Sequence, residues 1–153
     1  MTETKTSEKT TQLLPDSIPL FGYELLREVL LPNLLGKETA AILYWAGKDL
    51  ARKFPLQSFE EIVDFFIKAG WGSLSIKDES KHELTIELNS PMISERLKTK
   101  KDATFNLEAG FLAQQFELQK NAVTEAYEHK KKRSNTISIT VKWDKKDRVD
   151  DRQ

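Results

Sequence analysis

The spacing of hydrophobic residues changes along this chain, and the change restricts the folds that the chain can adopt. Over residues 19–69 apolar residues recur every three or four positions, as on one face of an α-helix. Over residues 73–88 and 136–143 they alternate with polar residues, as in a strand with one wet face. Because helical and strand patterns occupy separate blocks, we expect an α+β fold in which helices cover one face of a small antiparallel sheet.

Three helices are predicted before the first strand. The first begins at Pro19 and should bend or end at Pro32, because a proline lacks the backbone N–H that a helix interior needs. The second covers about residues 39–54. The third begins at an S-x-x-E capping box that starts with Ser58, and it ends at Gly70, which suits the left-handed position after a helix.

The second half of the chain predicts a hairpin, a long helix and a last strand. Residues 73–77 and 84–88 form the hairpin around a polar turn. A fourth helix runs from about Asn106, which can cap it, to about His129, and the last strand covers residues 136–143. This helix is long enough to cross the sheet, so the last strand need not pair with its neighbour in sequence.

The predicted domain organisation is a single α+β domain between two polar ends. Residues 1–17 read as a disordered leader, residues 18–144 as the domain, and residues 145–153 as a charged disordered tail. No apolar stretch approaches the roughly 20 residues needed to cross a bilayer, so we expect no membrane insertion.

Charge and cysteine content exclude several classes of function. The chain has 24 basic and 24 acidic residues, so its net charge offers no field to attract nucleic acid. Cysteine is absent, which excludes disulfides, thiolate zinc sites and a cysteine nucleophile. The absence of cysteine fits a reducing compartment, and we expect the protein to be cytoplasmic.

No constellation of residues predicts a catalytic site, a metal site or a cofactor. His82 and His129 are the only histidines, and their surroundings lack metal-ligand spacing. The basic run 130–133 is interpreted as cations that complement the dipole at a helix end. We expect a protein that is not an enzyme, although paired acids from different elements stay open, with Glu108 and Glu125 as the candidates.

Aromatic residues are concentrated in the helices and at their ends. They are predicted either to build the core or to line an apolar pocket, and core packing is favoured for Phe65, Phe66 and Phe116. The candidate pocket residues are Tyr44, Trp45, Phe65, Trp71, Phe105, Phe111 and Phe116.

Five segments resemble one known family: residues 23–36, 44–56, 65–72, 105–117 and 140–144. They are similar to the YslB family of Gram-positive bacteria, which is classed as a domain of unknown function. That family is in turn similar to 4-vinyl-reductase-type ligand-binding domains and to TRAPP trafficking subunits, which share this order of elements. Relatives often carry an acid that Glu125 matches and cysteines that this chain lacks, so a role that depends on cysteine is not implied.

The resemblance implies hydrophobic-ligand binding or protein assembly, and many members of the wider group dimerise through their N-terminal helices. We therefore expect a non-enzymatic homodimeric binding module with an apolar ligand pocket under the fourth helix. Small residues in the second helix let another backbone approach, and the candidate dimer residues are Leu26, Leu30, Ala46 and Gly47. The alternative is an adaptor that binds protein partners without a small-molecule ligand.

Overall fold

The structure is a computed structural model, and it describes residues 19–90, 93, 96, 103–130 and 135–144. The predicted leader and tail lie outside the described residues. The sequence predicts one domain over residues 18–144, and the structure divides the chain after Gly36 into two compact units, residues 1–36 and 37–153. Each unit is described by itself.

In the part of the first unit that the structure describes, residues 19–36, one helical segment continues past Pro32. It comprises α2 (Leu20–Glu24), the π-helix η1 (Leu25–Leu30) and α3 (Leu31–Leu35), and it ends where Gly36 takes a φ of 68°. Of the two outcomes predicted at Pro32, a bend or an end, the helix does not end there. The π turn, in which the Leu31 N–H donates to the Leu26 carbonyl, widens the helix where a proline ring would otherwise press on an earlier carbonyl.

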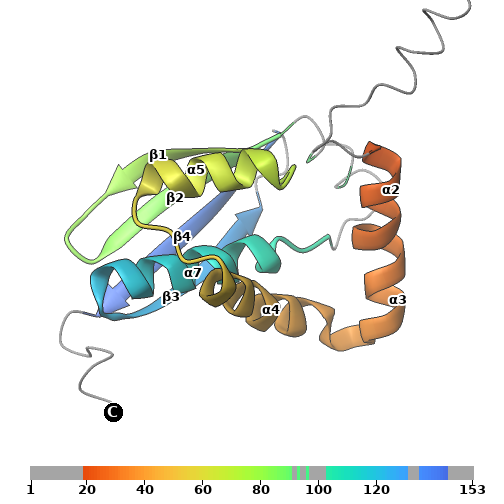
Figure 1. Ribbon diagram of the computed structural model, residues 1–153, viewed down its shortest axis with the longest axis horizontal. Coiled ribbons are helices and arrows are strands. Elements are labelled where there is room, and N and C mark those ends of the chain that lie inside the picture. Colours follow the sequence, from red (N-terminus) through yellow and green to blue (C-terminus); the bar gives the residue numbers. More distant parts are fainter. Residues whose placement is uncertain (1–18, 91–92, 94–95, 97–102, 131–134, 145–153) are drawn as a thin grey trace, which may run out of the picture. The chain divides into compact units, whose positions relative to one another are not determined.

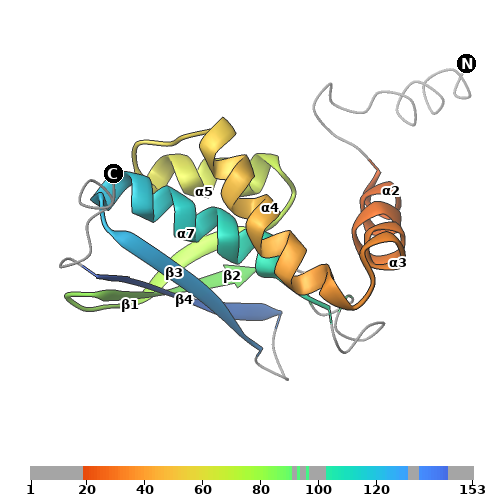
Figure 2. The same cartoon turned by 90° about the horizontal axis from the view of Figure 1, so that it is seen from below.

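The described residues of the second unit form three longer helices and four strands. After the 3-10 turn η2 (Gly36–Glu38), these are α4 (Thr39–Lys53), α5 (Phe59–Lys68), β1 (Ser73–Glu79), β2 (Glu83–Asn89), α7 (Asn106–Lys120), β3 (Val123–Lys130) and β4 (Thr136–Asp144). The sheet order is β1-β2-β4-β3, and all neighbours are antiparallel. Figure 2 shows α4, α5 and α7 on the same face of the sheet, which confirms the predicted α+β architecture.

The prediction that the fourth helix extends to His129 is wrong. The helix stops at Lys120 because Asn121 adopts a left-handed conformation (φ 53°, ψ 44°), and the following eight residues form β3. The chain therefore turns back along the sheet, and β4 pairs with both β2 and β3, so the last strand lies inside the sheet. Consequently the basic run 130–133 is not at a helix end: Lys130 closes β3, and residues 131–133 lie outside the described residues.

The predicted punctuation of α5 is confirmed at both ends. The Ser58 hydroxyl accepts a hydrogen bond from the Glu61 N–H at 3.2 Å, while the Glu61 carboxylate accepts from the Gln57 N–H at 2.9 Å. At the other end Gly70 has a φ of 75°, and the Trp71 N–H donates to the Phe66 carbonyl at 2.9 Å, as in a Schellman motif. The start of α7 differs from the prediction, because Phe105 occupies the N-cap position and Asn106 is the first helical residue, whose N–H donates to the Thr104 hydroxyl at 3.1 Å.

The predicted alternation of a buried and a wet face is confirmed in β2, whereas β4 is buried on both faces over residues 137–141, Ser138 and Thr140 included. In β2 and β4 the inward residues are buried, among them Ile86, Leu88 and Ile139. In β1 only Leu74 is buried among the described residues, and Ile76 is 43% exposed. The pairing of β1 with β2 shifts register between Ile76 and Asp78, and such a bulge turns an edge strand away from the regular pleat.

Two glycines set how closely α4 and α7 approach. A Cβ added to Gly47 would lie 2.1 Å from the Leu107 carbonyl oxygen, and one added to Gly110 would lie 2.0 Å from the Tyr44 carbonyl oxygen. Each helix therefore presents a glycine to the backbone of the other. Nine consecutive residues of α7, 108–116, are buried, because this helix packs on the sheet beside α5 and is crossed by α4 (Figure 1).

A methyl group at this crossing should push the two helices apart. We expect Gly110→Ala to lower the free energy of unfolding by about 3 kcal/mol. Overpacking of a tight core costs about 1–3 kcal/mol, and the added methyl group would meet the backbone of Tyr44, which cannot rotate away as a side chain can. Gly22→Ala is the matched control, because nothing lies within 4 Å of its added Cβ. Urea unfolding followed by circular dichroism measures both. Equal stability of the two variants would contradict the assigned role of the crossing.

Candidate functional site

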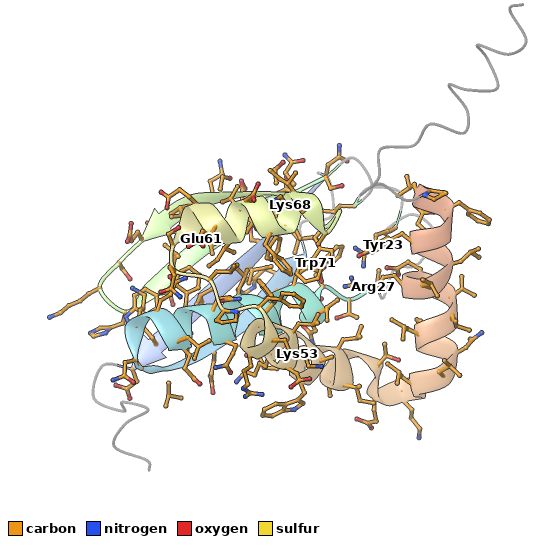
Figure 3. The ribbon with its side chains drawn as sticks, viewed as in Figure 1. Tyr23, Arg27, Lys53, Glu61, Lys68 and Trp71 are labelled. Carbon is orange, nitrogen blue, oxygen red and sulfur yellow. The ribbon has the colours of Figure 1, made fainter. Side chains whose placement is uncertain are left out.

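Three of the candidate pocket residues meet in an aromatic cluster between α5 and α7. The Phe65 ring stacks on the Phe111 ring at 4.6 Å, with an interplanar angle of 20°. Trp71 makes edge contacts with Phe65, Phe66 and Phe111 at 5.7, 4.9 and 5.4 Å. Figure 3 shows Trp71 between the two helices. The cluster reaches the surface at Phe54, whose exposed ring lies 5.8 Å from that of Phe65.

The other four candidate pocket residues lie elsewhere. Phe116 contacts the Phe59 ring at 6.5 Å, and Phe105 is fully buried under the Arg96 guanidinium, whose Cζ lies 4.1 Å from the ring centre. Tyr44 and Trp45 stand on α4 in an edge contact of 6.3 Å. The structure thus distributes the seven residues among several places instead of bringing them all together.

Tyr44 connects α4 to the outer edge of β3. Its hydroxyl accepts a hydrogen bond from the Ala126 N–H at 3.1 Å. Burial raises the pKa of Tyr44, and the nearby charges of Glu125 and Glu117 raise it further, against the hydrogen bond from Ala126, which lowers it. Beside it Trp45 is 62% exposed, and the Lys48 ammonium lies 5.1 Å from its ring.

A second contact from a helix to β3 comes from Glu117. One oxygen of its carboxylate accepts from the Thr124 N–H at 3.1 Å, and the other accepts from the Gln114 side-chain amide at 3.3 Å. Gln114 in turn accepts from the Arg52 guanidinium at 3.2 Å. A chain of polar contacts therefore runs from the end of α4 through α7 to β3.

Gln115 binds the connection between α4 and α5 through its side-chain amide. This role is not among the predictions made from the sequence. Its side-chain oxygen accepts from the Leu56 N–H at 3.0 Å, and its nitrogen donates to the Phe54 carbonyl at 2.8 Å. Gln119 adds a hydrogen bond to the Leu56 carbonyl at 3.0 Å. The available signal was a pair of glutamines inside an otherwise apolar stretch of helix, because buried amides must find partners.

The carboxylates and histidines considered for catalysis lie in different surroundings. Glu108 is fully buried in the first turn of α7, whereas Glu125 is exposed on β3. His82 is exposed near the hairpin turn, and His129 is exposed on β3 against the Tyr127 ring at 5.0 Å. Among the described residues, no group of three His, Cys, Asp or Glu side chains could hold a metal ion.

The helical segment Leu20–Leu34 of the first unit carries an unusual number of exposed apolar side chains. Each of the following is more than 40% exposed: Leu20, Phe21, Leu25, Leu26, Val29, Leu30 and Leu34. Two of the four candidate dimer residues, Leu26 and Leu30, belong to this set. Across the part of the chain that the structure describes, no helix combines the length and the apolar character needed to span a bilayer.

The two other candidate dimer residues lie on α4. The sequence predicts that Gly47 contacts a second copy. In the structure Gly47 is buried against α7 of the same chain, so it is not available to a second copy. The close backbone approach expected at Gly47 does occur, and its partner is an intrachain helix. Ala46 is half-buried.

Comparisons with known proteins agree with the predicted resemblance. A model of the family described as "Protein of unknown function (DUF2507)" matches residues 20–142. The uncharacterised protein YslB of Bacillus subtilis (strain 168) is 51% identical over 129 residues, which cover 84% of this chain and 87% of that protein.

The first two of the following solved structures show the same fold. A vinyl-4-reductase family protein from Methanocaldococcus jannaschii aligns with a TM-score of 0.62 and 20% identity, covering 84% of this chain and 83% of that one. A mutant H-NOX protein from K. algicida, in the Fe(II) unliganded form, aligns at 0.53 with 12% identity and coverages of 95% and 88%. Trafficking protein particle complex subunit 3 from Naegleria fowleri, covalently bound to palmitic acid, aligns at 0.44 with 13% identity and coverages of 82% and 89%.

Removal of the Gln115 amide should loosen the connection between α4 and α5. We expect Gln115→Ala to lower the free energy of unfolding by about 2 kcal/mol or more, since each buried polar group left unpaired costs about 1–3 kcal/mol. Gln119→Ala is the control on the same helix. Gln119 is exposed and donates to the Leu56 carbonyl, so its replacement should cost under about 1 kcal/mol. Chemical denaturation measures both, and a larger loss in the Gln119 variant would refute the assignment.

Proposed function

Because the chain belongs to the DUF2507 family, to which no function is assigned, we propose from its own structure that it is a non-enzymatic binding module that works as a homodimer. The observation that carries this proposal is the exposed apolar surface of the segment Leu20–Leu34. Fold alone would not support it, since one fold hosts many functions.

The exposed apolar residues of this segment form two rows. Phe21, Leu25 and Val29 follow one another at four-residue intervals, and so do Leu26, Leu30 and Leu34. Successive helical residues are roughly 100° apart around the axis, so the two rows lie on different sides. One packing surface cannot bury both rows, so the segment needs two packing surfaces to bury all of its exposed apolar side chains.

A second copy of the chain is the partner that this surface fits best. Burial of a large aliphatic side chain contributes about 1.5–3 kcal/mol, so an exposed row of three leucines favours association. In a two-fold dimer the same patch meets itself, and the row Leu26, Leu30 and Leu34 is free of charged residues and therefore self-complementary.

A localisation in the cytoplasm is part of this proposal.

Two substitutions in this row test the homodimer. We expect Leu26→Gln with Leu30→Gln to raise the dissociation constant of the dimer by about 100-fold, on the basis of roughly tenfold for each buried leucine. Glutamine keeps a high helix propensity, so the helix itself should persist. Sedimentation velocity over a concentration series measures the change.

The matched control is Leu25→Gln with Val29→Gln, which removes a similar apolar area from the other row. This control should remain a dimer. A monomeric wild-type protein at every concentration would refute the homodimer, and equal weakening by both pairs would refute the choice of row.

An apolar small molecule is the ligand that we propose for the module. The support for this ligand is the aromatic cluster of Phe65, Trp71 and Phe111, which extends to the surface at Phe54. Rotation of the half-exposed Phe65 ring would let an apolar molecule reach the Trp71 ring and replace the ring contacts between α5 and α7. The alternative function is an adaptor, which the highly exposed Trp45 on α4 favours, because tryptophan is enriched at the centres of protein interfaces.

Ligand content distinguishes the module from the adaptor. Native mass spectrometry of the purified protein should reveal a co-purifying small molecule, and Phe65→Ala should reduce its occupancy at least about tenfold through the lost ring contact. Trp45→Ala is the control and should leave the occupancy unchanged. Protein that carries no small molecule, in wild type and variants alike, would contradict the ligand and favour the adaptor.

A further inference from the structure

β3 is an edge strand of the sheet, and side chains from the helices cover its outer edge. Among the described residues, in the order β1-β2-β4-β3, this strand pairs with β4 alone, so its other side presents backbone groups that another strand could bind. The residues whose side chains point inward, Thr124 and Ala126, are the ones whose N–H groups point outward from the ladder.

Both of these N–H groups are bound by side chains from helices. The Ala126 N–H donates to the Tyr44 hydroxyl of α4, and the Thr124 N–H donates to the Glu117 carboxylate of α7, each at 3.1 Å. The two acceptors come from the two helices that cross at Gly47 and Gly110. The helix crossing therefore places an acceptor at two successive outward positions of the edge.

The opposite edge of the sheet is protected in a different way. In β1 the pairing with β2 shifts register between Ile76 and Asp78, and charged residues follow at 77–79. Bulges and charges are common means of keeping an edge strand from pairing. The pairing of β3 with β4 has no such register shift, and side-chain acceptors cover the outward N–H groups of Thr124 and Ala126.

We propose that Tyr44 and Glu117 close the outer edge of β3, and that this edge is a latent pairing surface for β3 of a second copy. Antiparallel pairing about a two-fold axis at Ala126 sets Glu125 opposite Tyr127 and Thr124 opposite Glu128. No two like charges face each other directly in this register, so the strand is compatible with itself. The side-chain acceptors restrict assembly to the helical surfaces.

The test opens the edge in the full-length protein. Tyr44→Ala with Glu117→Ala removes both acceptors, in a Leu26→Gln, Leu30→Gln background that removes association through the first helical segment. We expect the opened protein to self-associate with rising concentration in sedimentation velocity. It should also bind a fluorescent peptide of residues 123–130, which the background protein should not bind.

The matched control changes two exposed residues on the same helices, Asp49→Ala with Leu118→Ala, and should neither associate nor bind the peptide. A folded opened protein that keeps the size of the control and ignores the peptide overturns the proposal. Every protein in this comparison carries Leu26→Gln and Leu30→Gln, which remove the proposed homodimer interface. The outcomes are therefore independent of the proposed homodimer.

A milder variant covers the case in which the opened protein does not fold. Tyr44→Phe keeps the ring and removes only the hydroxyl, so hydrogen exchange at the Ala126 amide should accelerate at least about tenfold while the Thr124 amide is unchanged. An Ala126 amide that exchanges as slowly as in the wild-type protein overturns the proposal as well.

Discussion

The crossing of α4 and α7 at Gly47 and Gly110 fixes the distance between two helix backbones, and most of the polar contacts described above depend on that distance. Each added Cβ would meet a carbonyl oxygen at about 2 Å, so the helices lie closer than side chains would permit. At this distance the Tyr44 hydroxyl reaches the Ala126 N–H and the Arg52 guanidinium reaches Gln114. A wider crossing would break both contacts, so a glycine pair with no chemistry of its own positions the groups that cover β3.

The same crossing makes α7 the central helix of the second unit. Phe111 and Leu112, successive residues roughly 100° apart around the axis, are both fully buried, because the sheet lies under the helix, α4 crosses it and α5 lies beside it. The aromatic residues of α7 that the sequence offers as a pocket lining therefore first serve as core. Surface available for binding is concentrated instead on the segment Leu20–Leu34 and at Trp45, where large apolar side chains are exposed.

The comparisons agree with this division between fold and function. A likeness of 20% identity to a vinyl-4-reductase family protein shows a shared fold and carries no chemistry to this chain. The shared fold supplies a helical layer on an antiparallel sheet. What distinguishes this chain within that frame is its own set of residues, such as the paired glutamines of α7 and the exposed rows of the first helical segment.

The sequence by itself determined the features that depend on a few neighbouring residues. The capping hydroxyl of Ser58, the left-handed Gly70 and the alternation of β2 each need only local hydrogen bonds or a repeating pattern, and all are present. Family membership was also readable from short strings. The tertiary structure decided what depends on distant partners: residues 123–130 form a strand because β4 supplies their hydrogen bonds, and Gly47 meets α7 instead of a second chain. Helical spacing and strand alternation are hard to distinguish over eight residues, and a glycine in a sequence does not specify which backbone approaches it, so only the folded chain could decide either point.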